Sequence, residues 1–229
     1  MKNKIIKSFL DLLMPRICPV CKSSLNIDED YLCLKCLYDL PETNLHKIKF
    51  NRVEQLFAGK ICIERAAGYF YYEKDSPYAG IIKSIKYHNQ PLMARWLARN
   101  FASKITVDGF FNGIDLITPV PLYRNKMYKR GYNQCSYIAA GISDATGIPV
   151  KELLTAKRSH DSQTRKGIYD RWVNTQDIYY SIPDIELNGK HILIVDDVIT
   201  TGATLLACAQ AIKQDESIRI SFLSLGVGR

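Results

Sequence analysis

The residues best suited to chemistry stand in one thirteen-residue run, ILIVDDVITTGAT, at positions 192–204. Its leading apolar residues predict a buried strand of a parallel sheet. The adjacent carboxylates of Asp196 and Asp197 come at the carboxyl end of that strand, where open α/β sheets place their ligands. Small residues then turn the chain into a helix, whose N-terminal N–H groups suit a phosphate: Thr200, Thr201, Gly202, Ala203 and Thr204. The run predicts a site for a ligand with phosphate and hydroxyl groups and a divalent ion.

Two other interpretations of this run are available. Asp and Thr are also common in an ordinary helix-capping turn after a buried strand. A nucleotide-hydrolysing P-loop is disfavoured, because no Gly-Lys-Ser/Thr sequence follows the glycine.

A second chemical signal lies near the N-terminus, in two C-x-x-C pairs separated by a short loop. These are Cys18 with Cys21, and Cys33 with Cys36. Two such pairs complete the tetrahedral four-thiolate set of structural zinc. A redox pair needs only one C-x-x-C, and disulfides need an oxidising compartment, for which no secretory signal is seen. Cys62, Cys135 and Cys208 are isolated, and the last two are expected to be small buried residues.

Charge is distributed unevenly along the 229 residues. The net charge is +8, and residues 122–172 hold ten Lys/Arg and four acids, which leaves +6 in this segment. Tyr123, Tyr128, Tyr132, Tyr169 and Trp172 lie among these cations. Cations interleaved with aromatic rings suit single-stranded nucleic acid. The alternative is that the cations serve only an anionic small ligand and that the tyrosines are core residues.

The elements that must position these groups follow from hydrophobic periodicity. Strands alternate with helices, which predicts a parallel α/β sheet. Strands are expected at residues 66–72, 115–120, 153–156, 191–195 and 219–225. Helices are expected at residues 2–14, 80–87, 91–104, 134–145 and 203–213. Residues 40–64 are expected to be a linker, residues 119–134 a loop facing the aspartates, and residues 157–175 a basic excursion. No apolar stretch approaches the ~20 residues of a membrane span.

The run at 192–204 resembles, position by position, the binding motif of type I phosphoribosyltransferases. The resemblance implies that 5-phospho-α-D-ribose 1-diphosphate (PRPP) binds with Mg²⁺, that Asp196 and Asp197 take the ribose hydroxyls, and that Thr200–Thr204 takes the 5-phosphate. It implies that the loop after the 115–120 strand holds the pyrophosphate, and that a mobile loop carrying Gln163, Arg165, Lys166 and Arg171 closes over the substrate.

Taken together, the motifs resemble the ComF competence family. They are the cysteine pairs, the sequence KSIKY at 83–87, PVP and RGYNQ at 119–134, QTR at 163–165, and VDDVITTGAT. The resemblance implies a zinc module, placed at residues 1–45, and a phosphoribosyltransferase-like α/β domain at residues 46–229. It also implies a cytoplasmic protein of DNA uptake, peripheral to the inner membrane, where incoming single-stranded DNA and other uptake proteins are its partners.

Two functions remain open at this point. In the first, the chain binds PRPP and single-stranded DNA, the latter through Arg124, Lys126, Lys129 and Arg130. In the second, it is an active phosphoribosyltransferase on an unidentified small acceptor, with Asp196 or Asp197 in the catalytic step. No dedicated base is recognisable, since a lone histidine such as His88 or His160 is more often structural.

Overall fold

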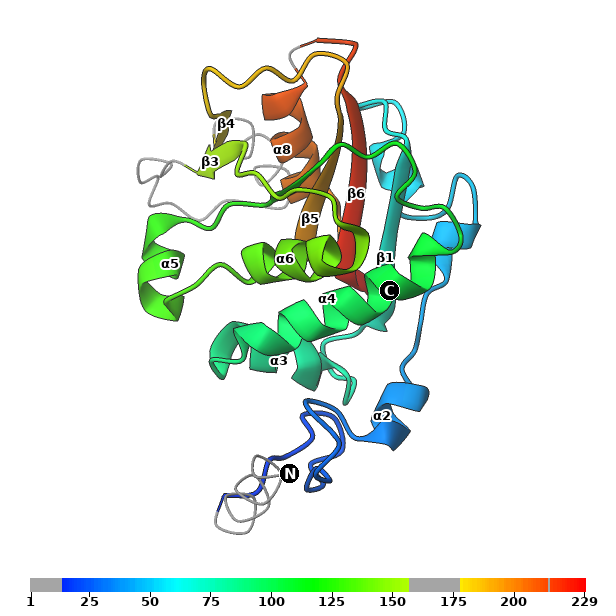
Figure 1. Ribbon diagram of the computed structural model, residues 1–229, viewed down its shortest axis with the longest axis vertical. Helices are drawn as coiled ribbons and strands as arrows, with labels where there is room; N and C mark the ends of the chain where they lie inside the picture. Colours follow the sequence, from blue (N-terminus) through cyan, green and yellow to red (C-terminus); the bar gives the residue numbers. More distant parts are fainter. Residues whose placement is uncertain (1–13, 157–177, 214) are drawn as a thin grey trace.

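The computed structural model describes residues 14–156, 178–213 and 215–229 and centres on a parallel sheet of four strands. The strand order is β1-β6-β5-β2, and all neighbouring strands pair in parallel (Figure 1). The strands are β1 (Arg65–Tyr72), β2 (Leu116–Pro119), β5 (His191–Ile199) and β6 (Arg219–Gly228). The parallel sheet predicted from the sequence is confirmed.

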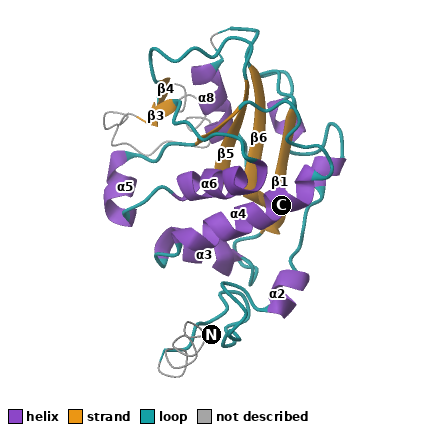
Figure 2. Cartoon of the chain, in the orientation of Figure 1, coloured by secondary structure: helices purple, strands orange, loops and turns teal. Residues whose placement is uncertain are grey.

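Helices cover both faces of this sheet. Alternate residues of β5 point to opposite sides, so that Leu193 and Val195 join one hydrophobic cluster, and Ile192 and Ile194 the other. The first cluster includes three helices, of which α4 and α6 cross the sheet in Figure 2: α3 (Ala79–Tyr87), α4 (Pro91–Thr106) and α6 (Gln134–Thr146). The second cluster includes α8 (Ala203–Ile212). The predicted helices in these positions are confirmed.

Two segments differ from the sequence prediction. The predicted loop at 119–134 contains helix α5 (Arg124–Arg130), which Gly131 ends in a left-handed conformation at φ +80°. Cations in its last turn favour the helix by opposing its dipole. Strand β3 (Leu154–Ala156) lies outside the main sheet, because it pairs antiparallel with β4 (Tyr179–Ser181).

The expectation of a linker at residues 40–64 is wrong, because this segment packs on the outer edge of β1. Glu42 forms an antiparallel bridge with Phe70, and the Thr43 N–H donates to the Tyr69 carbonyl at 2.9 Å. Two short 3₁₀ turns follow, η1 (Leu45–Lys47) and η2 (Glu54–Phe57). A covered edge strand is protected from pairing with another chain.

The cysteine-bearing segment lies against α3, at the lower end of the molecule in Figure 1. It contains the short helix α2 (Leu34–Tyr38). Its buried Leu25 and Leu32 belong to the same cluster as Ile81 of α3. The contact is close, because a Cβ added to Gly80 would lie 2.1 Å from the Pro19 carbonyl oxygen. The helix expected at residues 2–14 falls, except for Met14, outside the described residues.

Candidate functional site

The two aspartates lie inside β5 rather than at its end. The strand continues to Ile199, but its pairing with β2 stops where Pro119 meets Val195. Asp196 and Asp197 therefore follow directly after the point where β2 stops, at the carboxyl edge of the sheet. This is the position at which parallel α/β sheets bind ligands.

Asp197 is buried and has a partner on each carboxylate oxygen. Lys86 of α3 places its Nζ 2.8 Å from Oδ1, and the Gln134 side chain of α6 donates from Nε2 to Oδ2 at 2.5 Å. Burial acts to lower the pKa of Lys86, but the charge and hydrogen bond of Asp197, together with the charge of Asp196, outweigh it and the pKa is raised. Lys86 is therefore a charged ammonium beside the aspartate pair.

Asp196 lies in a different environment. Its Oδ1 accepts the Asp197 N–H at 2.8 Å and lies 3.4 Å from the Cys135 Sγ. Burial, and then the neighbouring Asp197 charge, raise the pKa of Asp196 to about 7. Burial and Asp196 also raise the pKa of Cys135, which makes it a neutral thiol donor. Cys135 is buried as expected, but it contacts the carboxylate and so belongs to the site.

The turn after β5 leads into α8 through Gly202, which caps the helix at φ +75°. Thr200 and Thr201 are exposed, and the Thr201 Oγ1 accepts the Ala203 N–H at 3.4 Å. The first N–H groups of a helix have no partners within the helix. The turn therefore offers hydroxyl and amide donors that follow the aspartates in the chain.

A cavity of about 700 Å³ joins these groups. Asp196, Asp197 and Thr204 line it together with Lys86 and three cations of α5: Lys126, Lys129 and Arg130. Arg124 is exposed on α5 but does not line the cavity. His88 does not line it either, while His160, Gln163, Arg165, Lys166 and Arg171 lie outside the described residues.

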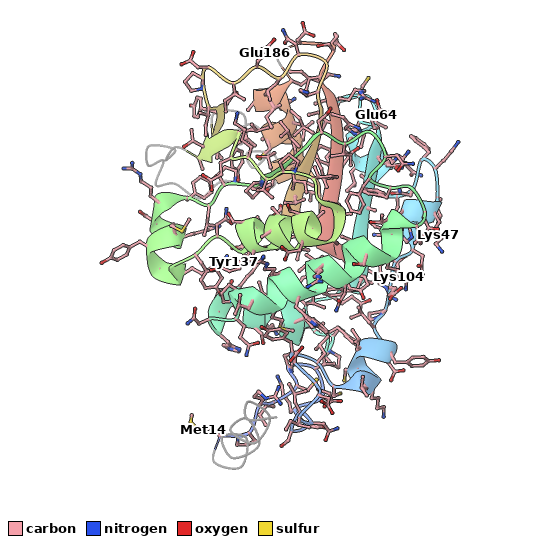
Figure 3. All side chains as sticks on the ribbon, in the orientation of Figure 1. Met14, Lys47, Glu64, Lys104, Tyr137 and Glu186 are labelled. Carbon is pink, nitrogen blue, oxygen red and sulfur yellow. The ribbon has the colours of Figure 1, made fainter. Side chains whose placement is uncertain are left out.

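Most tyrosines near α5 have structural partners. Tyr132 packs edge-to-face on Tyr137, which Figure 3 labels, and its hydroxyl donates to the Ile85 carbonyl. Tyr123 lies on Tyr179, with ring centroids 6.2 Å apart. Tyr128 is 93% exposed. Of the five aromatic residues noted in the sequence, Tyr169 and Trp172 lie outside the described residues.

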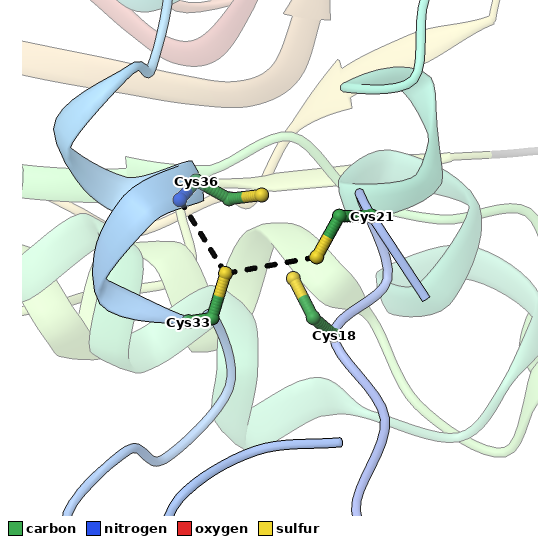
Figure 4. A group of neighbouring side chains, drawn as sticks. All are labelled: Cys18, Cys21, Cys33 and Cys36. Carbon is green, nitrogen blue, oxygen red and sulfur yellow. Dashed lines mark hydrogen bonds between the residues drawn. The ribbon is translucent and has the colours of Figure 1, made fainter. Parts of the chain in front are cut away.

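The four cysteines of the paired motifs converge, with all their Sγ atoms within 4.8 Å of one another (Figure 4). The Cys21 and Cys33 sulfurs are 3.7 Å apart, too far for the ~2.05 Å of a disulfide. Hydrogen bonds from Ser23 lower the pKa of Cys21 to about 6, whereas burial raises that of Cys36.

The Glu29 carboxylate holds the loop between the pairs by accepting the Asn26 and Leu34 N–H groups at 2.6 Å and 2.7 Å, and the Arg16 guanidinium donates to the Asn26 carbonyl of the same loop at 3.0 Å. These hydrogen bonds hold the second pair beside the first. Four convergent sulfurs on such a frame could hold a zinc ion.

Comparison with protein families and with known proteins finds relatives of this chain. Residues 133–224, from the start of α6 into β6, match the phosphoribosyl transferase domain family. Competence protein F of Haemophilus influenzae is 30% identical over 135 residues, which cover 56% of this chain and 58% of that protein. DNA utilization protein YhgH of Escherichia coli is 26% identical over 198 residues, covering 85% of this chain and 82% of that protein. Competence protein ComFC of Bacillus subtilis is 26% identical over 110 residues, covering 48% and 41%.

These similarities support a ComF-family protein. This ComF chain spans a little over half the length of its Haemophilus relative. Its fold is the predicted one, a phosphoribosyltransferase-type parallel sheet flanked by helices with a cysteine cluster that fits a zinc module. Among the described residues, its helices lack the combination of length and hydrophobicity that crossing a bilayer requires.

The ComF site includes three residues to which no site role was assigned from the sequence: Lys86, Gln134 and Cys135. Lys86 lies in the KSIKY stretch and Gln134 ends the RGYNQ stretch, so both motifs contained a signal. What the sequence did not show is that the two side chains meet at Asp197.

Proposed function

We propose that this ComF protein binds PRPP with Mg²⁺ in the cavity at the carboxyl edge of β5. The observation that carries the proposal is the position of Asp196, Asp197 and Thr204 in one cavity lined by cations, with the exposed Thr200 and Thr201 in the turn between them. The ribose hydroxyls lie against the carboxylates and the 5-phosphate in the turn. Arg165 and Lys166 are proposed to close over the ligand.

The two proposed metal ions, Mg²⁺ and zinc, have different sets of candidate ligands in this chain. Mg²⁺ is usually held by one or two carboxylates together with substrate phosphates and waters. Within the part of the chain that the structure describes, no cation or side-chain amide contacts the Asp196 oxygens, so Asp196 fits this role, whereas both Asp197 oxygens already have partners. Mg²⁺ there would offset the negative charge of the phosphates. Zinc fits the sulfurs of Cys18, Cys21, Cys33 and Cys36.

The second part of the proposal is that single-stranded DNA binds along α5 through Arg124, Lys126, Lys129 and Arg130. Support comes from the composition of this helix, which has four cations, no acid and no buried residue. The fully exposed ring of Tyr128 stands among these cations and offers a face for stacking. Three of the cations also line the cavity, so DNA and PRPP would share them.

The biological role proposed is natural transformation. Two of the relatives are named as competence proteins and one as a DNA utilization protein. We infer that the chain acts on incoming single-stranded DNA at the cytoplasmic side of the inner membrane, together with other uptake proteins.

Titration of the full chain tests this function. The protein is titrated with PRPP and Mg²⁺, with single-stranded oligonucleotides, and with each in the presence of the other. We expect both to bind and each to weaken the other, because they share cations. Absence of PRPP binding contradicts the first part of the proposal, and absence of DNA binding at low salt contradicts the second.

An active phosphoribosyltransferase is a second candidate function, favoured by one observation. Asp196 lines the cavity, and burial with the adjacent Asp197 charge raises its pKa to about 7, which suits a carboxyl group that accepts a proton from an acceptor nitrogen near neutral pH. Pyrophosphate release in the presence of PRPP and a panel of bases tests it. Pyrophosphate release that depends on one base supports transfer. Absence of release with every base contradicts transfer and leaves PRPP binding as the function.

A further inference from the structure

A chain of four side chains from four separate elements runs along one wall of the cavity. Lys86 of α3 contacts Asp197 of β5 at 2.8 Å, and Asp197 accepts from Gln134 of α6 at 2.5 Å. The Gln134 Oε1 in turn accepts from the Arg130 guanidinium, at the end of α5. The two ends of the chain are cations, and both line the cavity.

Gln134 is the residue type that this chain of contacts requires. Its oxygen must accept from a guanidinium and its nitrogen must donate to a carboxylate, and an amide does both. A glutamate there would offer no donor to Asp197. Gln134 and Asp197 are each only 5% exposed, whereas the Lys86 side chain is 24% exposed. The central pair borders the cavity with little exposed surface, whereas the two cations are more exposed to it.

Arg130 also contacts the helix that carries Lys86, through the ring of Tyr87. The Arg130 guanidinium lies over the Tyr87 ring, 5.7 Å from its centroid, and Tyr87 follows Lys86 at the end of α3. Arg130 is thus held by an amide on one side and an aromatic face on the other. Long cationic side chains lose much rotamer entropy when they are fixed, so cations fixed in advance bind an anion with a smaller entropic loss.

We propose that Asp197 and Gln134 are positioning residues that hold Lys86 and Arg130 for the diphosphate of PRPP. Asp196 is left as the carboxylate that faces the ribose and its metal ion. The inference rests on the proposed PRPP binding and divides the aspartate pair into two roles. The diphosphate is assigned to Lys86 and Arg130 because the proposed site for the 5-phosphate is the turn before α8. In addition, two fixed cations match two adjacent phosphates.

The test uses pyrophosphate and ribose 5-phosphate as separate probes, titrated calorimetrically with Mg²⁺ into the full chain. Lys86→Met should weaken pyrophosphate binding by about tenfold or more, the loss of a hydrogen bond to a charged group. Gln134→Leu, which by this account does not touch the ligand, should also weaken it. Both variants should bind ribose 5-phosphate within about twofold of the parent, because that ligand lacks the diphosphate.

Two further variants separate positioning from general damage to the fold. Lys86→Arg keeps a cation and should restore most of the pyrophosphate affinity. In the Arg130→Met background, Gln134→Leu should cost much less than it does alone, because part of its effect passes through Arg130.

The inference is overturned if Lys86→Met and Gln134→Leu bind pyrophosphate as the parent does, or if both ligands weaken equally in each. A parent protein that fails to bind PRPP itself contradicts the proposed function, and the inference with it. The parent's PRPP titration therefore tells the two failures apart.

Discussion

Gly202 of the turn after β5 packs directly on the ring of Phe57. A Cβ at Gly202 would lie 2.9 Å from the Phe57 Cζ, closer than such atoms approach in real structures. Phe57 ends η2, in the segment whose sequence indicates only a linker. This segment therefore supports the turn proposed to bind phosphate, and the turn has no room for a side chain at its glycine.

Gly202→Ala is predicted to destabilise the protein by about 1–3 kcal/mol. The left-handed backbone and the contact with Phe57 both oppose a Cβ there. Gly147→Ala is the matched control, since Gly147 has φ +74° and no atom within 4 Å of the added Cβ. Chemical denaturation should show a larger loss at 202 than at 147, and equal losses would show that the Phe57 contact costs nothing.

Zinc is predicted to bind as one ion per chain at the four cysteines. Each of Cys18→Ser and Cys36→Ser should lower the zinc content of the purified protein, measured by atomic emission. Chelation should loosen the surrounding segment, because a structural zinc site contributes folding free energy. Cys62→Ser is the control, since this exposed residue lies outside the cluster. A parent protein without zinc, or with a disulfide after fresh reduction, would refute the site.

Binding of PRPP with Mg²⁺ is predicted to tighten as the pH rises through about 7. The raised pKa of Asp196 means that below this pH its carboxyl holds a proton, which competes with a metal ion and with hydroxyl donors. The ligand's own phosphates also titrate, so the comparison is with Asp196→Asn, which should lack the protein's part of the pH step. Identical pH profiles for parent and variant would remove Asp196 from this role.

Reversal of the α5 cations is predicted to weaken single-stranded DNA binding and flatten its salt dependence. Each phosphate neutralised contributes a slope of about −0.7 in log K against log salt on a single strand. The changes are Arg124→Glu, Lys126→Glu, Lys129→Glu and Arg130→Glu. A control with the same change in net charge reverses four exposed lysines away from the cavity: Lys35, Lys49, Lys74 and Lys151. If both quadruple variants weaken binding equally, net charge rather than α5 is responsible.

The sequence was a good guide wherever a segment has strong periodicity. The apolar runs that became β1, β5 and β6, and the amphipathic α3, α4 and α6, were predicted to within a few residues. Helix α5 was not, because it is short, basic and has no buried face from which a helical period could be recognised. Residues 40–64 misled for a related reason: their order comes from a few hydrogen bonds to β1 and from scattered buried residues such as Leu45, Val53 and Phe57, which leave no local pattern.

The candidate site was predictable only in part. Asp196, Asp197 and the threonine turn are contiguous, so one motif revealed them. Lys86, Gln134 and Cys135 come from α3 and α6 and meet the aspartates only through the order of the strands. The spacing of residues along one chain does not indicate which side chains from separate elements come into contact.

The most direct test of the account is calorimetric titration of PRPP with Mg²⁺ into the parent protein and into Asp196→Ala/Asp197→Ala. The variant must keep the parent's circular dichroism spectrum and a cooperative unfolding transition. The parent should bind, and the double change should remove most of the affinity, because the ribose hydroxyls and the metal lose Asp196 and the Lys86 ammonium loses Asp197. A folded variant that binds PRPP as tightly as the parent would contradict it.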